Sequence, residues 1–340
     1  MLDTAVLKHH PADFLVRENL VTALVDHADA SHHYLLLRKS GYTTMEAVRL
    51  IADRLGLPAT DITYGGLKDE DGVTEQLVAL PVGTLTGQDI EPSISTDEGE
   101  LSLQHYGYGA DPLRIGGLEG NGFRVVVRNL PEGTAAELAD RRKINLLFLN
   151  YYDTQRFGVP GGPKRTHFVG AALLEGDYST ALRELAELRA PESASARAWT
   201  GEATAYFHHE LDPRTVAFYL AAHSSSLWNK TLQNLVESTC SGWIRVEQEG
   251  LPYLYPTGRG SGAAVMAVAP DLPYRRYTFE NGVPIGTAST RPTVVQTVVA
   301  VSGLEADPFH PGRFAITARF FLPSGCYATA AIRQLLAHRD

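Results

Sequence analysis

The segment "YGGLKDEDGVTEQ", Tyr64–Gln76, places three consecutive carboxylates beside a lysine, between two apolar runs. Two glycines precede this group and a third, Gly72, follows it. Because Asp and Gly are ordinary turn residues, a plain charged turn is the simplest interpretation. Two features favour a functional one: Thr74 and Gln76 are polar where a strand is expected to enter a core, and a carboxylate beside a lysine stays ionised and can act as a nucleophile or base.

Three kinds of ligand site fit the sequence poorly. An EF-hand aligned on Gly72 would place Leu67 and Val78 at its first and last ligand positions, where calcium needs oxygen ligands. A phosphate loop at residues 158–166 would have Pro163, which lacks an amide hydrogen, directly before its lysine. The histidine pairs are adjacent and lack the i, i+4 spacing of a helical zinc site; they are His9-His10, His32-His33 and His208-His209. We therefore expect no metal site.

The composition is that of a globular protein. The chain has 340 residues, 44% of them hydrophobic and 20% charged, which suffices for one large domain or two ordinary ones. No apolar run approaches the ~18 residues of a membrane span, and the first residues do not resemble a secretory signal. Because Cys240 and Cys326 cannot form a disulfide framework or a four-cysteine zinc site, we expect a cytoplasmic protein.

The formal net charge of −9 argues mildly against a nucleic-acid partner, because phosphates are bound by local positive potential. A basic groove on an acidic body would suffice, however. The short basic runs are interpreted as solvated surface rather than RNA contacts; they are Arg141-Arg142-Lys143, Lys164-Arg165 and Arg275-Arg276.

The first part of the chain mixes helix and strand signals. Thr43 and Glu46 have the spacing of a capping box, and the apolar periodicity after them predicts a helix that Gly56 ends. Residues 76–82 and 123–130 are typical of strands, whereas residues 134–152 are interpreted as one helix running into Tyr151-Tyr152.

From Leu173 to Glu237 the pattern is mostly helical, with a loop expected at residues 193–205 and a long helix that begins with Asp212 as N-cap and Pro213 at its first position. Strand signals then return around a hairpin turn at Asn281-Gly282, and residues 328–339 predict a closing helix. The order α+β, mostly α, α+β indicates a helical insertion within one mixed domain.

Seven motifs together resemble the TruD family of pseudouridine synthases. Gly66–Gln76 is similar to the family signature of glycine-leucine-lysine-aspartate followed by threonine-x-glutamine. Six further motifs occur in the family's order over nearly the whole chain: HHPADFLVREN (9–19), YLLLRKSGYTTMEAVRLIADRLGL (34–57), GNGF (120–123), NYYDTQRFG (150–158), SSSLWNKTL (224–232) and FFLPSGCYATAAIRQLL (320–336). Six motifs in the correct order make a chance resemblance implausible.

The resemblance implies an isomerase that converts uridine in RNA to pseudouridine without cofactor or metal. Asp69 matches the family's catalytic aspartate, which attacks the anomeric carbon of the ribose or removes a proton from the neighbouring carbon to give a glycal. The target base must be flipped out and held by stacking and edge hydrogen bonds. Phe14, Asn121 and Tyr327 match substrate-contacting positions, and Phe123 matches an aromatic residue near the target base.

Other residues of the motifs receive further roles. Lys68 or Arg156 is expected to keep Asp69 ionised or to meet a phosphate. Phe157 is expected in the core, and Glu70 and Asp71 in solvent. The implied fold is α+β, with a catalytic domain of mostly antiparallel mixed sheet (1–155 and 285–340) and a mainly helical α/β insertion domain (156–284).

The RNA itself is less well specified, and tRNA is the expected substrate. Gly122 stands where the family commonly has a basic residue, Asp153-Thr154 where glycine is usual, and Thr166 or His167 where asparagine is often found. The alternatives are a synthase serving another RNA or a nucleoside natural product, and a non-catalytic RNA-binding or RNA-folding protein on the same fold. A metal hydrolase using Asp69, Asp71 and nearby histidines has no support from the ligand spacing.

Overall fold

The computed structural model describes residues 4–68, 72–84, 93–97, 99–258 and 260–338. Asp69, Glu70 and Asp71 therefore lie outside the described residues. The chain divides into two compact units, the first made of Asp3–Asn145 with Thr297–Gly325 and the second of Leu146–Gln296 with Cys326–Asp340. These units reflect contacts within the chain, and the division into a catalytic and an insertion domain stays a prediction.

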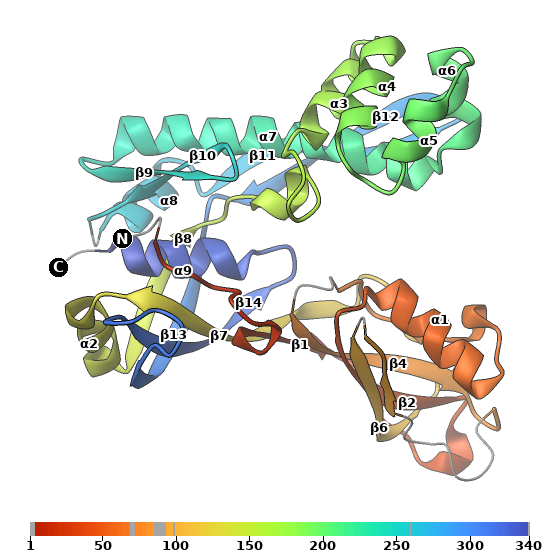
Figure 1. Ribbon diagram of the computed structural model, residues 1–340, viewed down its shortest axis with the longest axis horizontal. Helices are drawn as coiled ribbons and strands as arrows, with labels where there is room; N and C mark the ends of the chain where they lie inside the picture. Colours follow the sequence, from red (N-terminus) through yellow and green to blue (C-terminus); the bar gives the residue numbers. More distant parts are fainter. Residues whose placement is uncertain (1–3, 69–71, 85–92, 98, 259, 339–340) are drawn as a thin grey trace. The chain divides into compact units, whose positions relative to one another are not determined.

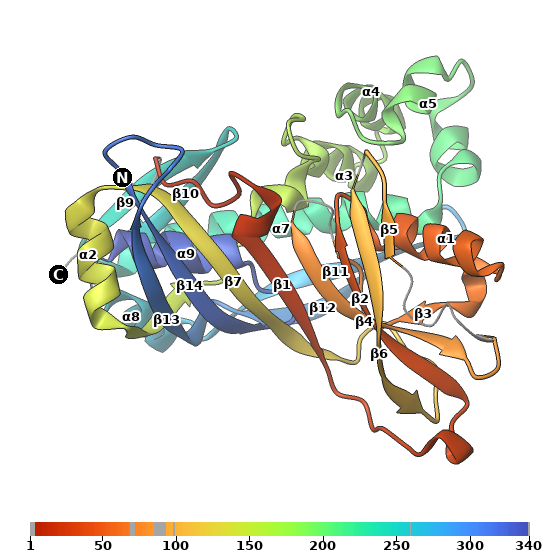
Figure 2. The same ribbon diagram turned by 60° about the horizontal axis from the view of Figure 1, so that its bottom comes forward.

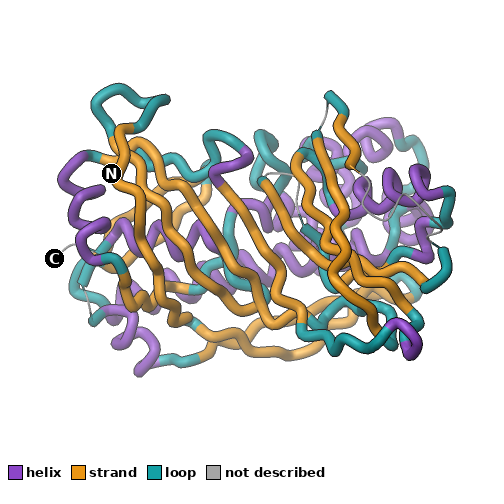
Figure 3. Tube along the Cα trace, turned by 90° about the horizontal axis from the view of Figure 1, so that it is seen from below, coloured by secondary structure: helices purple, strands orange, loops and turns teal. Residues whose placement is uncertain are grey.

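Ten strands of the described part form one sheet in the order β5-β6-β2-β4-β1-β7-β14-β13-β8, with β3 paired to β4 (Figures 2 and 3). Their bounds along the chain are β1 Phe14–Leu20, β2 His32–Ser40, β3 Thr63–Tyr64, β4 Val73–Pro81, β5 Ser93–Ser95, β6 Glu100–Gly109, β7 Leu118–Leu130, β8 Lys143–Leu149, β13 Val294–Ala306 and β14 Phe314–Pro323. The chain passes from one unit to the other within β8 and again within β13.

The sheet is mixed but mostly antiparallel, which confirms the predicted fold class. β1 and β4 run parallel, with Leu15 paired to Val73. β1 pairs with β7, β7 with β14, β14 with β13, β4 with β2 and β3, and β6 with β2 and β5, all antiparallel. β4 begins within the segment Tyr64–Gln76, at Val73, so its pairing with β1 brings the last residues of that segment, Val73–Glu75, beside β1.

Helix α1, Thr44–Leu55, covers the β2–β4–β6 part of the sheet (Figure 1). The Thr43 hydroxyl accepts from the Glu46 amide, and Gly56 ends the helix in the left-handed conformation at φ 67°, as the sequence predicts. The apolar face of α1 is buried with strand residues in one core that includes Val48, Ile51, Leu35, Leu37, Val78 and Leu80. Each such side chain contributes roughly 1.5–3 kcal/mol on burial, which holds α1 against β2, β4 and β6.

The second unit is built on the long helix α7, Pro213–Thr239, whose first turn is capped by Asp212 as predicted. The shorter helices are α3 Thr166–Leu174, α4 Tyr178–Glu187, α5 Ser193–Ala198, α6 Ala203–Ala205, α8 Ser261–Val268 and α9 Ala328–Ala337. α3, α4 and α7 share a core that includes Val169, Leu185 and Leu220 (Figure 1).

Two hairpins complete the second unit. They are β9 Trp243–Gln248 with β10 Leu251–Pro256, and β11 Asp271–Glu280 with β12 Val283–Pro292. Asn281 and Gly282 have φ of 52° and 78°, the positive pair that a two-residue hairpin turn requires, so this prediction is confirmed. β11 runs along α7 (Figure 1), where the Ser224 hydroxyl accepts from the Arg275 amide.

Two local predictions are wrong. The helix expected over residues 134–152 is α2, Glu132–Arg141, followed by strand β8. The segment Ile144–Leu149 is apolar except for Asn145 and has no clear period, and short segments of this kind occur in both buried strands and helices. The loop expected at residues 193–205 contains α5 and α6, because Ala196 and its neighbours join the helical core.

Among the described residues, no helix combines the length and apolar character needed to cross a membrane.

Candidate active site

One face of the first unit's sheet gathers three of the predicted site residues. Side chains alternate along a strand, and directly paired residues point to the same face. Phe14, Val16 and Glu18 of β1 pair with Val125, Phe123 and Asn121 of β7. Thr74 of β4 pairs with Val16 on the other side of β1. Phe14, Glu18, Asn121, Phe123 and Thr74 thus share this face, next to the part of the sheet that α1 covers.

The aromatic residues on this face contact each other. The rings of Phe14 and Phe123 meet edge-on with centroids 6.1 Å apart, and Phe123 stacks on Phe320 at 5.5 Å and an interplanar angle of 22°. The Lys8 ammonium lies 4.8 Å from the centre of the Phe14 ring. Phe14 and Phe320 are buried whereas Phe123 is partly exposed, so Phe123 offers an aromatic surface against which a base could stack.

Gln76 and Thr44 bind the backbone of Gly66 and Lys68, which are described residues of the segment Tyr64–Gln76. The Gln76 side-chain amide donates to the carbonyl of Gly66 over 3.0 Å, and its oxygen accepts from the Thr44 hydroxyl over 2.8 Å. The Thr44 hydroxyl also accepts from the amide of Lys68 over 2.8 Å. Gln76 and Thr44 are both about 1% exposed, so these hydrogen bonds are shielded from water.

A buried lysine also binds the backbone of Lys68. Lys39, 1% exposed, donates to the carbonyls of Tyr42 and Lys68 over 2.7 and 3.2 Å. The Lys68 carbonyl also accepts from the Thr44 amide over 3.2 Å. The backbone of Lys68, the residue directly before Asp69, is therefore fixed through both its N–H and its C=O.

The side chain of Lys68 has a partner that the sequence did not suggest. Its ammonium forms an ion pair of 2.9 Å with Oε1 of Glu18, and the two side chains are 9% and 1% exposed. Gly66 closes one side of this pair, because a Cβ atom there would lie 2.9 Å from Glu18 Oε1 and 3.3 Å from Lys68 Nζ. The expected role of Lys68 beside Asp69 or a phosphate stays a prediction.

Three oxygen atoms on this face lack a hydrogen bond within the described part of the chain. Glu18 Oε2, Asn121 Oδ1 and Thr74 Oγ1 are buried and unpaired there. Asn121 lies inside β7 rather than at its end. Buried polar atoms are nearly always hydrogen-bonded in folded proteins, and exceptions often mark functional sites.

The other two predicted site residues, Tyr327 and Arg156, belong to the second unit. Tyr327 precedes α9 and meets the Tyr152 ring edge-on at 6.2 Å, and burial raises the pKa of its phenol to about 12. Arg156 donates to the Ser225 hydroxyl over 3.3 Å and lies over the Phe218 and Tyr152 rings. Phe157, 2% exposed, is a core residue as predicted.

The motif at residues 150–158 is tied to β12 and α9. Arg291 donates to the carbonyl of Asn150 and, over 2.7 Å, to its side-chain oxygen. The Arg291 guanidinium lies 4.1 Å from the centre of the Tyr152 ring. Asp153 accepts from the Thr329 hydroxyl over 2.5 Å and faces Arg333 at 3.7 Å. The departure from glycine at position 153 therefore has a structural role.

The short basic runs differ in their surroundings. Lys164 is buried, with its ammonium on the carbonyls of Gly158 and Val159, which excludes it from solvated surface. Arg165 pairs with Glu184 over 2.8 Å. Arg275 and Arg276 are exposed on β11, as expected for a solvated face.

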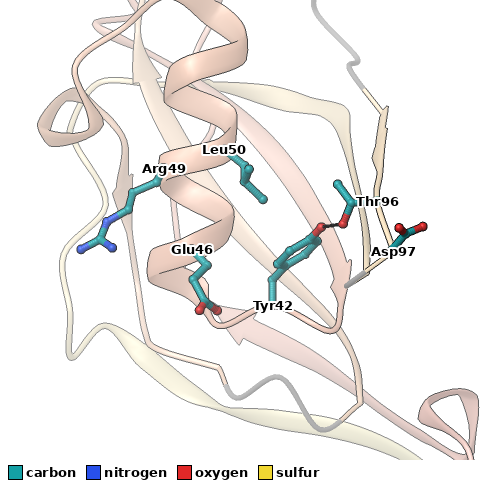
Figure 4. A pocket seen from close by; sticks show the side chains of 6 residues that line it. All are labelled: Tyr42, Glu46, Arg49, Leu50, Thr96 and Asp97. Atoms are coloured by element: carbon teal, nitrogen blue, oxygen red, sulfur yellow. Dashed lines mark hydrogen bonds between the residues drawn. The ribbon is translucent and has the colours of Figure 1, made fainter. Parts of the chain in front are cut away.

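A separate pocket of the first unit lies beside α1 and is lined by Tyr42, Glu46, Arg49, Leu50, Thr96 and Asp97 (Figure 4). The Tyr42 and Thr96 hydroxyls are hydrogen-bonded to each other, and Glu46 is occupied by the cap of α1. Three of the six lining side chains are thus engaged in local structure. Across the described residues, no group of three or more His, Cys, Asp or Glu is arranged to hold a metal ion.

Sequence reasoning missed Glu18, Lys39 and Thr44 as parts of this site. Each lies in a motif that was used for the family resemblance, but none is close in sequence to the signature segment. The signal that could have identified Glu18 and Lys39 is a charged residue within a strand on the face expected to be buried, because such residues are almost never buried without a partner.

Comparison with known proteins gives consistent matches. The family model described as tRNA pseudouridine synthase D (TruD) matches residues 4–208. A tRNA pseudouridine synthase D of Geobacter sulfurreducens is 26% identical and aligns over 97% of this chain and 93% of its own. The tRNA pseudouridine synthase D of an Anaeromyxobacter species is 37% identical over 54% of this chain, and this chain spans about half (49%) of that protein.

Among solved structures, a putative tRNA pseudouridine synthase D from Methanosarcina mazei aligns with a TM-score of 0.61 over 97% of this chain and 93% of its own, at 18% identity. At that identity, the likeness concerns the fold.

Proposed function

This chain belongs to the TruD family of pseudouridine synthases, and from that premise we propose that it isomerises a uridine of tRNA through Asp69. Membership confirms the predicted family, the α+β fold class and the class of enzyme, an isomerase that forms pseudouridine. The tRNA substrate, the roles of individual residues, the two domains and a cytoplasmic location remain parts of the proposal.

The observation that carries the assignment of Asp69 is the anchoring of Lys68. Its N–H and C=O are bound by Thr44 and Lys39, and the preceding Gly66 is bound by Gln76. Lys68 is thus fixed beside the face that carries Phe14, Phe123 and Asn121, because its ammonium pairs there with Glu18. A carboxylate that must meet one ribose carbon requires such positioning, because a displacement of about 1 Å can cost a factor of about 100 in rate.

The isomerisation of uridine requires few other groups from the protein. The N1–C1′ bond breaks, the uracil rotates, and a bond forms between C5 and C1′. The proton lost from C5 balances the one gained by N1, so no oxidant, reductant or metal enters the balance. The Asp69 carboxylate would act either by attacking C1′ or by removing the C2′ proton, while Phe123 offers a stacking surface for the uracil.

Two carboxylate variants test the proposal. Wild type, Asp69→Asn and Asp71→Asn are incubated with a tRNA pool, and pseudouridine is mapped in the products. We expect wild type and Asp71→Asn to modify the same uridine at similar rates, and Asp69→Asn to leave it unmodified. Equal modification by wild type and Asp69→Asn would refute the assignment of Asp69. RNA binding without modification by wild type would favour the non-catalytic alternative.

A further inference from the structure

Only one of the two oxygens of the Glu18 carboxylate has a partner within the described part of the chain. Its side chain is 1% exposed, and Oε1 is paired with Lys68 at 2.9 Å. Oε2 is buried and has no hydrogen-bond partner among the described residues. Leaving an acceptor of a buried carboxylate unpaired is costly, so this oxygen is suited to a ligand that brings a donor.

Residues near Glu18 also carry oxygen atoms that could accept a hydrogen bond from a ligand. Asn121 lies directly opposite it on β7, where paired Cβ atoms are roughly 4.5–5.5 Å apart. Asn121 Oδ1 is unpaired in the same described region, as is Thr74 Oγ1 on the strand at the other side of β1. Three oxygen atoms that can accept a hydrogen bond, two of them on directly paired residues, are thus unpaired on one face within the described part of the chain, and a donor-bearing group could satisfy them.

The target nucleotide supplies donors of two kinds. Uracil carries N3–H on the edge that remains accessible when the base is flipped out, and the ribose carries its 2′-hydroxyl. Cytosine has a lone pair at N3, which a carboxylate would repel. Because Lys68 offsets the charge of Glu18, the carboxylate can approach a uracil that carries negative charge after the N1–C1′ bond breaks.

We propose that Glu18 is a positioning and specificity residue whose Oε2 accepts a hydrogen bond from the target uridine, with N3–H of the uracil as the donor. This inference rests on the proposed function. It adds an acceptor that distinguishes uracil from cytosine, next to Phe14, Asn121 and Phe123, which the sequence already singles out.

The test is a cycle of protein and RNA changes. Binding is measured with Asp69→Asn protein, so that turnover does not interfere. The RNA is a synthetic stem-loop carrying the mapped target uridine, its N3-methyl form or its 2′-deoxy form. Glu18→Gln is the test variant, because it keeps the shape and places an amide where the carboxylate was. Glu75→Gln is the matched control, since Glu75 lies on the opposite face and pairs with Arg38 at 2.6 Å.

We expect N3-methylation to weaken binding at least ~10-fold more in protein with Glu18 than in Glu18→Gln, as for loss of a hydrogen bond to a charged group. In the Glu75→Gln control, N3-methylation of the RNA should weaken binding as much as it does in protein with unchanged Glu75. A methyl clash alone would weaken both proteins equally, so equal losses overturn the proposal. A selective effect of the 2′-deoxy form instead would overturn N3–H as the donor and assign the contact to the ribose.

Two further measurements keep the outcome clear. Should Glu18→Gln fail to fold, the pair is removed together as Glu18→Gln with Lys68→Met, which leaves no buried ammonium unpaired. Wild type is assayed for pseudouridine on the unmodified RNA. If wild type forms pseudouridine but N3-methylation weakens binding equally with Glu18 and with Glu18→Gln, the role of Glu18 is refuted and the proposed function stays intact. If wild type forms no pseudouridine, the proposed function itself is refuted.

Discussion

Gln76 and Gly66 are joined by a buried hydrogen bond of 3.0 Å from the side-chain amide to the backbone carbonyl. The bond links β4 to the segment that precedes Asp69, ten residues back along the chain. The fixed distance between the two ends of the signature thus has a physical reason, because the glutamine at its end holds the glycine at its start.

Replacing Gln76 by Leu should reduce turnover far more than RNA binding. The variant keeps a similar volume but leaves the Gly66 carbonyl unpaired, which should cost about 1–3 kcal/mol in unfolding free energy and at least ~10-fold in single-turnover rate. Glu75→Gln, one residue away on the opposite face, should change the rate less than about twofold, because exposed ion pairs contribute little. A Gln76→Leu enzyme that is as fast as wild type would contradict the anchoring role.

Adjacent threonines separate loop anchoring from helix capping. Thr44→Val removes the hydroxyl that joins Gln76 to Lys68, so it should cost roughly 1–3 kcal/mol of stability and slow turnover, and Thr44→Ser should restore both. Thr43→Ala removes the N-cap of α1 and should cost about 0.5–2 kcal/mol with turnover nearly unchanged. Chemical denaturation and rate measurements on the three variants check this. Equal slowing by Thr44→Val and Thr43→Ala would show that the rate follows stability alone.

Substitutions at two glycines test whether the close approach of Gly66 to Glu18 and Lys68 is needed for turnover. In Gly66→Ala the new Cβ would lie 2.9 Å from Glu18 Oε1, so the buried ion pair must shift, and turnover should fall about 10-fold or more. Gly133 lies in α2 with nothing within 4 Å of such a Cβ, and Gly133→Ala should stabilise the protein by roughly 0.5–1 kcal/mol at wild-type turnover. Turnover and melting temperature are measured for both. Wild-type activity of Gly66→Ala would show that this pair tolerates displacement.

Local chemistry explains which elements the sequence predicts correctly. The capping box at Thr43, the left-handed Gly56 and the turn at Asn281-Gly282 each act within a few residues, so the sequence alone reveals them. Strand β8 escaped prediction because its apolar run has no period and its identity depends on its neighbour β13.

The candidate site likewise has parts that the sequence identified and a contact that it did not. The signature segment and the aromatic residues were identified by resemblance, and the register of β1 with β7 brings Phe14, Phe123 and Asn121 to one face. The pairing of Lys68 with Glu18 joins residues 50 positions apart. No local pattern encodes such a contact, because it arises only when β1 and β4 align in parallel.

The second unit should lose stability in mild acid through His167. Burial, followed by the charges of His223 and Arg165, lowers the pKa of His167 to about 4, whereas an unfolded histidine titrates near 6.5. Between these values the unfolded state binds more protons, so the contribution of His167 is complete above about pH 6.5 and is lost as the pH falls toward 4. His167 is partly exposed, so we expect roughly 1–2 kcal/mol of this loss between pH 7 and pH 5.

The variant His167→Phe should remove that part of the pH dependence. Phenylalanine retains the ring contacts that His167 makes with Phe157 and Phe168, and the Nδ1 atom it deletes is buried without a partner within the described residues. Trp199, Trp228 and Trp243 all lie in the second unit, so urea unfolding followed by tryptophan fluorescence reports on that unit. His209→Gln, an exposed histidine, should behave as wild type. The same decrease between pH 7 and pH 5 in wild type and His167→Phe would rule out His167 as its source.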